Sequence, residues 1–355
     1  METINTKHII WVTPGFAATE QDSQCIPPMQ LLAKALMKVD GLQLHIISLH
    51  YPKDNTPYQW HGTQVYPCAR KGPATKIRTR IAAFRQLTKL LKQYPTALLH
   101  SFWMTDACLV THLANRRFGV NHLVTLMGQD ARPGNRYLKL LPSTSMTKVG
   151  LSLFHADQFQ KTTGSKVDYI IPWGVAAHSI SSSTSKKYDV IGVGSLIPLK
   201  QYDYFIDLLV LVKKTIPSFS ALLVGDGPER QKLEALATEK GLADNLTFTG
   251  ALPREEVLSL MAQSKVFLHT SSYESFGFVL VEALQQGAQV VATPVGIAPE
   301  LSNTVVGTNS QELFEAIIGG IHRLFEAENV TNFSLSSVAD AYLELYTAQK
   351  QTTNP

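Results

Sequence analysis

The sequence predicts an α/β protein built from two Rossmann-like domains that face each other across a cleft. Short apolar runs alternate with helical patterns almost throughout the chain, which is typical of doubly wound sheets. A polar segment of low complexity, Ile180–Lys187, separates two such series and has the composition of a linker. The length of 355 residues also suits two domains better than one core. We therefore assign residues 1–172 to an N-terminal domain and residues 188–334 to a C-terminal domain.

In the N-terminal domain, each predicted strand is a short apolar run bounded by polar or turn-forming residues. These strands are His8–Val12, Leu42–Leu49, Ala97–Ser101, His122–Leu126, Lys148–Leu153 and Val167–Ile171. Helices are predicted to begin near Pro28, Lys76, Thr105 and Ala156. The segment 55–75 is rich in Pro, Gly, Tyr and Trp and is predicted to be a variable loop that lines an acceptor pocket.

The helix predicted over residues 76–93 stands out by its charge. No acidic residue lies between Asp54 and Asp106. Eight basic residues occupy this stretch: Arg70, Lys71, Lys76, Arg78, Arg80, Arg85, Lys89 and Lys92. Apolar residues recur at helical spacing (Ile77, Ile81, Phe84, Leu91), so an amphipathic helix with a cationic outer face is expected. An ordinary solvated helix face is the plainer interpretation, and a site for anionic lipid or an acidic acceptor is the alternative.

The C-terminal domain repeats the alternation of strands and helices. Its predicted strands are Asp189–Val193, Ser220–Val224, Leu246–Thr249, Val266–His269 and Gln289–Ala292. Its predicted helices are Asp203–Lys214, Pro228–Lys240, Arg254–Gln263 and Gly277–Gln286. A last helical pattern, at about 335–350, fits either domain and is assigned as packing back on the N-terminal one.

Composition excludes several classes of protein. The chain is 45% hydrophobic and 17% charged, and its net charge of +4 is too weak to indicate nucleic acid as a partner. Its three cysteines are Cys25, Cys68 and Cys108, and they are too few and too widely spaced for a disulfide framework or a zinc site. The N-terminus lacks a signal-peptide pattern, and no apolar run approaches a membrane span. We expect a cytoplasmic protein, with a peripheral position at the inner membrane face as an alternative.

Two carboxylates, Glu274 and Glu282, mark the most informative segment. Glu282 lies within the apolar run Phe278–Leu284, which predicts a buried helix. Burying an unpaired carboxylate is costly, so Glu282 needs hydrogen-bond donors, and the hydroxyls of a ribose would serve. Gly277 opens this helix, whose first N–H groups can hold an anion. An internal partner, such as a lysine or a backbone amide, is an equally common arrangement for an isolated buried Glu.

With this segment, the second half of the chain resembles glycosyltransferase family 4, retaining enzymes of the group 1 glycosyltransferases with the GT-B fold. Six segments occur in the family's order: Ile171–Val175, Val193–Lys200, Leu223–Arg230, Phe248–Pro253, Glu274–Glu282 and Val290–Glu300. Such a series is far more specific than a single glycine motif. The first half resembles the family more loosely, through Thr13–Phe16 and Leu123–Asp130.

The resemblance implies a site for a sugar nucleotide. Glu282 would accept hydrogen bonds from the ribose and Glu274 from a hydroxyl of the donor sugar. The N–H groups of Phe276, Gly277 and Phe278 would cradle the diphosphate. Further implied donor-binding residues are Gly15, Ser195, Lys200, Leu252 and Pro253. Of these, Lys200 would neutralise the leaving diphosphate, Gly15 would let backbone approach it, and Leu252 and Pro253 would line the base pocket.

The implied reaction transfers a hexosyl group, with retention, from a UDP- or GDP-sugar to a glycan or lipid-linked acceptor, as in the synthesis of cell-surface polysaccharides. No Asp-x-Asp pair occurs, so we expect no metal at the diphosphate and no cofactor.

Two positions depart from the family. Ser195 stands where an Arg is usual, and Arg132 or Arg136 is a candidate to supply the missing charge. Met127 stands where a histidine is usual near the reacting carbon. His100, at the end of a predicted strand, is a catalytic candidate, although histidines at strand ends are more often structural. These departures keep a second hypothesis open, a non-catalytic GT-B binding or scaffold partner of another transferase; epimerisation or phosphorolysis of a sugar is a weaker third.

Overall fold

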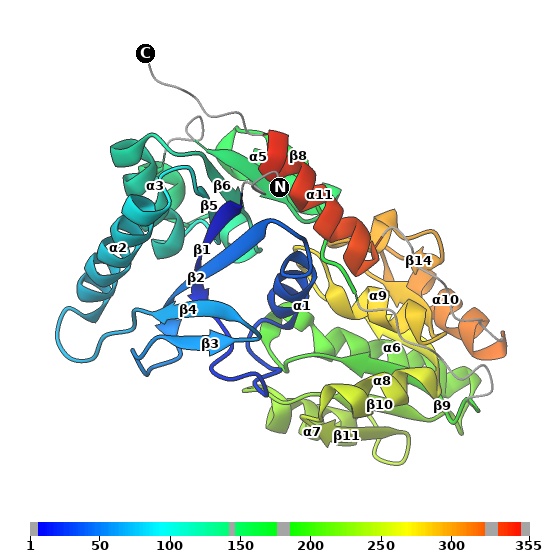
Figure 1. Ribbon diagram of the computed structural model, residues 1–355. Coiled ribbons are helices and arrows are strands. Elements are labelled where there is room, and N and C mark those ends of the chain that lie inside the picture. The colour runs from blue at the N-terminus through cyan, green and yellow to red at the C-terminus, as the bar shows by residue number, and fades with distance from the viewer. Residues whose placement is uncertain (1–5, 142–145, 176–184, 324–332, 349–355) are drawn as a thin grey trace. The chain divides into compact units, whose positions relative to one another are not determined.

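The computed structural model describes residues 6–141, 146–175, 185–323 and 333–348, and it divides into two compact units (Figure 1). Unit 1 combines residues 1–176 with residues 333–355, and unit 2 comprises residues 177–332. Most of the predicted linker, residues 180–184, lies outside the described residues. Each unit is a mainly parallel sheet covered by helices, so the predicted fold class of two Rossmann-like α/β domains is confirmed.

Unit 1 contains a sheet in the order β3-β4-β2-β1-β5-β6-β7-β8, in which only β3 runs antiparallel to its neighbour. Its strands are β1 (Lys7–Gly15), β2 (Leu42–Tyr51), β3 (Tyr58–Trp60), β4 (Thr63–Pro67), β5 (Leu98–Phe102), β6 (His122–Thr125), β7 (Thr147–Gly150) and β8 (Tyr169–Ile170). Its helices are α1 (Pro27–Leu36), α2 (Thr75–Gln93), α3 (Asp106–Phe118), α4 (Tyr137–Leu140), α5 (Leu153–Thr163) and α11 (Leu335–Ala348). The central strands β5 and β6 are buried along their whole length, as expected for a parallel sheet covered on both faces.

The last helix, α11, completes the core of unit 1 although it follows unit 2 in the sequence. Its Tyr342 and Tyr346 are fully buried. Trp11 Nε1 donates to the Tyr346 hydroxyl at 3.2 Å, and His100 Nδ1 lies 2.7 Å from the same hydroxyl. The Tyr342 hydroxyl lies 3.0 Å from Thr125 Oγ1. Since buried polar groups are costly unless paired, this network fixes α11 against β1, β5 and β6.

Unit 2 contains a fully parallel sheet in the order β11-β10-β9-β12-β13-β14. Its strands are β9 (Tyr188–Val193), β10 (Ala221–Val224), β11 (Leu246–Gly250), β12 (Ser264–His269), β13 (Gln289–Ala292) and β14 (Thr304–Val306). Its helices are α6 (Tyr202–Thr215), α7 (Arg230–Glu239), α8 (Arg254–Ala262), α9 (Phe278–Gln285) and α10 (Ser310–His322). The chain runs outward from β9 in one direction through β10 and in the other through β12. The strand order therefore reverses between β9 and β12, where ligands of such sheets bind at the carboxyl ends.

Four sequence expectations need correction. Segment 55–75 is not only loop: β3 and β4 form a hairpin in it, joined by His61 and Gly62 with φ of 45° and 88°, as a type I′ turn requires. Strand β7 ends at Gly150, and Leu153 begins α5 because Ser152 caps that helix. Strand β14 and helix α10 were not anticipated.

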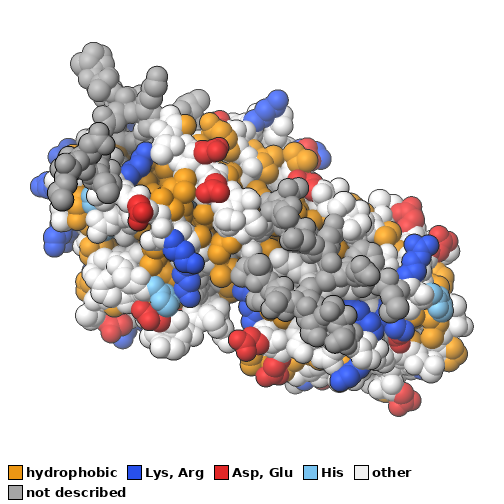
Figure 2. Space-filling view, turned by 45° about the vertical axis from the view of Figure 1, so that its right-hand side comes forward, with side chains coloured by type: hydrophobic (Ala, Val, Ile, Leu, Met, Phe, Trp, Pro, Cys, Tyr) orange, Lys and Arg blue, Asp and Glu red, His pale blue; other side chains and the backbone are white. Residues whose placement is uncertain are grey.

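The fourth correction concerns α2, whose Ile77 and Ile81 are 57% and 45% exposed and not part of the buried face. The buried residues of this helix are Thr79, Ala83, Leu87, Leu90 and Leu91. In the first half of α2 the buried face is thus formed by the small residues Thr79 and Ala83, and the two isoleucines lie on the exposed face. The basic residues of α2 lie in a stretch without acidic residues. On the face of the molecule shown in Figure 2, acidic and basic side chains lie interspersed among apolar ones.

Candidate functional site

The site of unit 2 lies at the carboxyl ends of β9 and β12, where the strand order reverses. Lys200 ends the short 3₁₀ helix η2 (Pro198–Lys200) after β9, and Glu274 lies in the loop after β12. Hydrogen bonds join the two loops: Thr270 Oγ1 donates to the carbonyls of Lys200 and Gln201 at 3.0 and 3.1 Å, and Ser272 N donates to the Leu199 carbonyl at 2.9 Å. These bonds bring Lys200 and Glu274 together although 74 residues separate them.

The carboxylate of Glu274 is held by three donors. Its Oε1 lies 2.5 Å from Lys200 Nζ, 2.9 Å from Ser271 Oγ and 3.2 Å from His269 Nε2. Burial by itself would raise the pKa of Glu274, but the hydrogen bond from His269 and the charge of Lys200 outweigh it and lower the pKa to about 2. Burial lowers the pKa of His269, so its imidazole is neutral near pH 7. Glu274 is therefore a fixed anion within a cluster of donors.

Glu282 is in a different environment, on the buried side of α9. Its side chain is 8% exposed, and its Oε1 lies 2.5 Å from Nη2 of Arg254, the first residue of α8. Neither Nε nor Nη2 of Arg254 makes a well-aligned hydrogen bond within the described residues, so this pairing is electrostatic. Burial raises the pKa of Glu282, and Arg254 offsets only part of that effect. The internal partner that the sequence left open for Glu282 is thus an arginine in this ligand-free structure.

The first turn of α9 lies between the two carboxylates in sequence. Gly277 precedes the helix with φ of 89°, a conformation that favours glycine. The N–H of Leu280 donates to the Gly277 carbonyl at 2.9 Å, and the start of the helix carries its partial positive charge. Phe278 is the first helical residue, and Cζ of the Arg254 guanidinium lies 5.4 Å from the centroid of its ring. This end of unit 2 is suited to an anion, because it brings together the positive charges of a helix start, Lys200 and Arg254.

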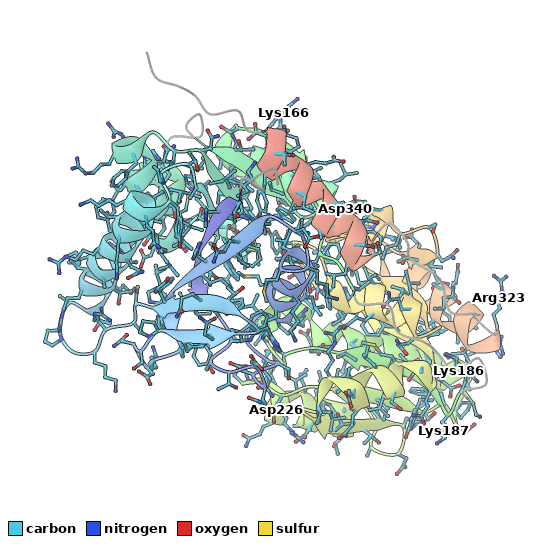
Figure 3. The ribbon with its side chains drawn as sticks, in the orientation of Figure 1. Lys166, Lys186, Lys187, Asp226, Arg323 and Asp340 are labelled. Carbon is cyan, nitrogen blue, oxygen red and sulfur yellow. The ribbon has the colours of Figure 1, made fainter. Side chains whose placement is uncertain are left out.

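Two glycines let the loops after β9 and β10 come into contact at the carboxyl ends of the unit 2 strands. A Cβ on Gly225, after β10, would lie 1.9 Å from the carbonyl oxygen of Gly194, after β9. Ser195, the residue after Gly194, is exposed. Asp226 accepts a hydrogen bond from Gly227 N and pairs with Arg230 at 3.2 Å, so it is a turn residue and not the cap of α7. Figure 3 labels Asp226 at this end of the sheet and Lys186 at the opposite end.

Several predicted residues lie in unit 1 and are described there. Gly15 ends β1 at a register shift beside Tyr51. His100 is fully buried, and its ring nitrogens lie 2.7 Å from the Tyr346 hydroxyl and 2.8 Å from Thr125 Oγ1. Burial lowers its pKa well below the usual value. Because both nitrogens are engaged inside the core, the structural interpretation of His100 replaces the catalytic one.

Arg132 lines a pocket of about 570 Å³ in unit 1, at the carboxyl ends of β5 and β6. The other lining residues are Trp103, Thr105, Gln129, Asp130, Pro133, Gly134 and Asn135. Asp130 accepts from the N–H groups of Met127, Gly128 and Met104, so its carboxylate organises the loop. Arg136 lies over the ring of Tyr137 at 5.4 Å and does not line this pocket.

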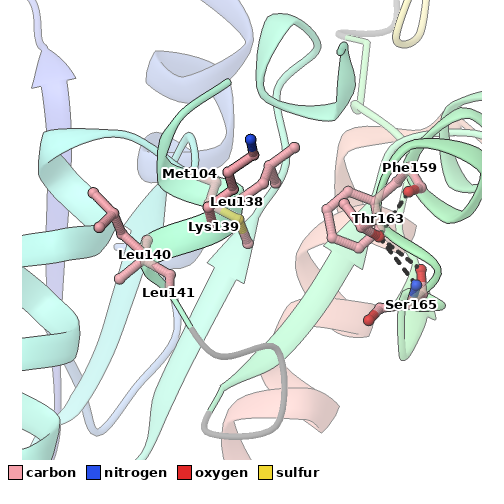
Figure 4. A pocket seen from close by; sticks show the side chains of 8 residues that line it. All are labelled: Met104, Leu138, Lys139, Leu140, Leu141, Phe159, Thr163 and Ser165. Atoms are coloured by element: carbon pink, nitrogen blue, oxygen red, sulfur yellow. Dashed lines mark hydrogen bonds between the residues drawn. The ribbon is translucent and has the colours of Figure 1, made fainter. Parts of the chain in front are cut away.

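A second pocket of unit 1, of about 360 Å³, is mainly apolar (Figure 4). It is lined by Met104, Leu138, Lys139, Leu140, Leu141, Phe159, Thr163 and Ser165. Thr163 Oγ1 donates to the Phe159 carbonyl at 2.8 Å and ties down the end of α5. None of the residues predicted to bind the donor lines this pocket.

Sequence reasoning missed three residues of the unit 2 site: Arg254, His269 and Ser271. Ser271 and His269 lie three and five residues before Glu274, so proximity along the chain was a usable signal. Arg254 was not predictable in this way, because its pairing with Glu282 depends on how α8 packs beside α9.

Residues 176–318 match the model of the family described as glycosyl transferases group 1. Among curated proteins, the chain is 37% identical over 108 residues to 2-deoxystreptamine glucosyltransferase of Streptomyces kanamyceticus, covering 30% of this chain and 28% of that protein. It is 33% identical over 173 residues to D-inositol 3-phosphate glycosyltransferase of Mycobacteroides abscessus, and the match covers 43% of this chain and 38% of that protein. The chain thus spans about a third of the length of the curated relatives it matches. The resemblance to group 1 glycosyltransferases is confirmed over the matched residues.

Solved structures match the whole chain at low identity. Sucrose-phosphate synthase from Thermosynechococcus elongatus aligns with a TM-score of 0.73 at 17% identity, over 96% of this chain and 98% of that one. Anabaena HepE in complex with UDP and glucose aligns with a TM-score of 0.72 at 19% identity, over 97% of this chain and 100% of that one. These similarities confirm the GT-B fold.

Proposed function

We propose that the chain is a retaining glycosyltransferase that moves a hexosyl group from a sugar nucleotide to a glycan or lipid-linked acceptor, because residues 176–318 match the model of glycosyl transferases group 1. The observation that carries the proposal is the arrangement of Glu274, Lys200 and Glu282 around the start of α9. This arrangement offers two carboxylate acceptors for sugar hydroxyls and a cationic seat for a diphosphate. The UDP complex of the structural neighbour HepE supports a UDP-sugar as the first donor to test.

In this proposal each residue has a separate task. Glu282 accepts from the ribose hydroxyls once the nucleotide displaces Arg254. The N–H groups of Phe276, Gly277 and Phe278, together with Lys200, hold the diphosphate, where negative charge grows as the glycosidic bond breaks. Glu274 orients the donor sugar through its hydroxyls. No step requires a bound metal, and Leu252 and Pro253 border the base.

The alternative is a GT-B protein that binds a partner transferase without catalysing transfer, as Ser195 and Met127 suggested. The pairing of Glu282 argues against it, since a buried carboxylate whose charge is only partly offset is expensive to keep without a ligand. Turnover of a sugar nucleotide distinguishes the two hypotheses.

We expect one sugar nucleotide among the UDP, GDP and ADP forms to raise the melting temperature. A ligand at about 100 times its Kd stabilises by roughly 2.7 kcal/mol, a shift of about 5 °C for a protein of this size. The measurement is differential scanning fluorimetry with each sugar nucleotide and each free nucleoside diphosphate. If no nucleotide shifts the transition and none is turned over, the transferase proposal is wrong and the scaffold alternative takes its place.

We also propose that α2 of unit 1 contacts an anionic membrane surface, as a peripheral protein at the inner membrane face would. The outer face of α2 presents Ile77 and Ile81 beside exposed basic residues: Lys76, Arg78, Arg85, Lys89 and Lys92. Paired apolar and cationic side chains are what an interfacial helix needs. Within the described residues, no helix has the length and apolarity to cross a bilayer.

The protein is expected to pellet with vesicles containing anionic phospholipid at low salt and to be released at high salt, because screening weakens charge attraction. The variant Ile77→Ser/Ile81→Ser should bind these vesicles about 30-fold more weakly or worse, since each of the two buried apolar side chains contributes roughly 1–2 kcal/mol. Leu153→Ser is the matched control, because Leu153 is 61% exposed on another helix of the same unit. Equal pelleting with neutral vesicles, or equal loss in the control, would remove the support for this surface.

A further inference from the structure

The three donors on Glu274 differ in how firmly they are held. His269 is the last residue of β12 and pairs in register with Ala292 of β13. Ser271 follows two residues later, and its carbonyl accepts from Thr293 Oγ1 at 2.6 Å. Both side chains belong to buried residues, 4% and 1% exposed. Lys200, in contrast, reaches Glu274 on a flexible four-carbon chain from another loop.

The hydrogen positions in this cluster follow from its chemistry. An ionised Glu274 can only accept, and Ser271 has one proton, which points to Glu274 Oε1 at 2.9 Å. His269 Nε2 lies 3.2 Å from both Glu274 Oε1 and Ser271 Oγ, so it must carry the proton and donate to both. His269 Nδ1 is buried without a hydrogen-bond partner within the described residues, which suits the unprotonated nitrogen of a neutral ring. His269 is thereby a donor with one fixed tautomer.

All three contacts are made by Oε1, so none of them occupies Oε2 of Glu274. The lone pairs of Oε2 can therefore accept from hydroxyls of the donor sugar. If Lys200 holds the diphosphate, as the proposed function requires, its amino group cannot remain on Glu274. A buried carboxylate that loses its cation needs other donors to keep its position.

We propose that His269 and Ser271 are positioning residues that hold Glu274 in its sugar-binding orientation while Lys200 passes from Glu274 to the diphosphate. The inference rests on the proposed function and adds two residues that the sequence resemblance does not assign. It also explains how one lysine serves two anions in turn: Lys200 neutralises Glu274 in the free protein and the diphosphate in the complex.

The test compares His269→Met, which removes the N–H donor, with His269→Gln, whose amide restores an N–H near the Nε2 position. Ser271→Ala is the companion variant. With UDP-glucose as probe, His269→Met is expected to lower kcat at least about 10-fold, since small displacements of a positioning group cost rate steeply. Its Kd for UDP, which lacks the sugar, should stay within about threefold of wild type. His269→Gln should recover most of the loss.

His122 supplies a matched control, because it is another buried histidine whose Nε2 lies 2.8 Å from a serine, Ser101, but in unit 1. His122→Met should lower the melting temperature, but it should leave both kcat with UDP-glucose and the Kd for UDP close to the wild-type values. Loss of UDP binding in parallel with kcat in His269→Met, or no rescue by glutamine, would show a merely structural role and overturn the proposal.

A second measurement can be made without a sugar nucleotide. In ¹⁵N NMR of labelled histidines, the signal lost in His269→Gln should belong to a neutral ring protonated at Nε2 at pH 7 and above. Glu274→Ala should change its chemical shifts. An Nδ1-protonated ring would contradict the positioning role of His269 even if UDP-glucose is not the donor. Absence of turnover with every sugar nucleotide would contradict the proposed function alone.

Discussion

Replacement of Glu274 by glutamine is expected to lower the rate of sugar transfer by about 100-fold or more, a loss typical of removing one preorganised group from an active site. The same change should destabilise the ligand-free protein. Glu274 has a pKa of about 2 in the folded state against an ordinary value of 4.5, so ionised Glu274 stabilises the fold, by up to roughly 3 kcal/mol near neutral pH. Lys200, Ser271 and His269 would lose the anion on which they converge.

The sign of the pH dependence follows from the lowered pKa. The contribution of Glu274 is fully present above the unfolded value of 4.5 and is lost as the pH falls towards about 2. The wild-type protein and the glutamine variant should therefore converge in stability below pH 4.5. The measurement is chemical unfolding at several pH values, with transfer assayed at neutral pH. Glu239→Gln, an exposed site at the end of α7, is the control and should change neither quantity. An active and equally stable Glu274→Gln protein would contradict the site assignment.

Replacement of Glu282 is expected to have the opposite effect on stability. Burial raises the pKa of this carboxyl, so its ionised form destabilises the fold, and this cost appears as the pH rises through the unfolded value of 4.5. Glu282→Gln should therefore melt at a higher temperature than wild type near pH 7. Arg254 tolerates the change because the amide oxygen of glutamine can still accept from its Nη2, which lies 2.5 Å from Glu282 Oε1 in the wild type.

Replacement of Glu282 by alanine should have a severe effect on donor binding. Hydrogen bonds from a ligand to a charged group contribute about 1.5–3 kcal/mol each, so loss of the ribose contact in Glu282→Ala should weaken donor binding about 100-fold or abolish it. Isothermal titration with the nucleoside diphosphate that shifts the melting temperature measures this directly. Unchanged affinity would mean that Arg254 is the permanent partner of Glu282 and that the ribose binds elsewhere. A protein made more stable by losing a ligand-binding residue would illustrate the exchange of stability for function.

The sequence predicted the burial of Glu282 and the helix start after Gly277, because both signals are local. A glutamate within an apolar helix and a glycine before that helix can be recognised without knowing any neighbour. Strands β9 to β13 of unit 2 were predicted to within two residues for the same reason, since short apolar runs in a parallel sheet stand out from their flanks, whereas the short strand β14 was missed.

Features that depend on packing between elements could not be read in this way. The exposure of Ile77 and Ile81 depends on which face of α2 packs against the rest of unit 1, and that face carries Thr79 and Ala83. His100 had the position of a cleft residue along its strand, but its environment is set by Tyr346, 246 residues later in the chain. The partner of Glu282 likewise comes from the neighbouring helix α8. In each case the chemistry was visible in the sequence and the neighbour was not.

The position of α11 has a consequence for the order in which the protein folds during synthesis. Unit 2 is contiguous in sequence, so its core can close as soon as residues up to α10 have left the ribosome. Unit 1 begins earlier but must wait for Tyr342 and Tyr346 to satisfy Trp11, His100 and Thr125. The half of the chain that is made first is therefore completed last, and until then its buried histidine and threonine face an unfilled side of the sheet.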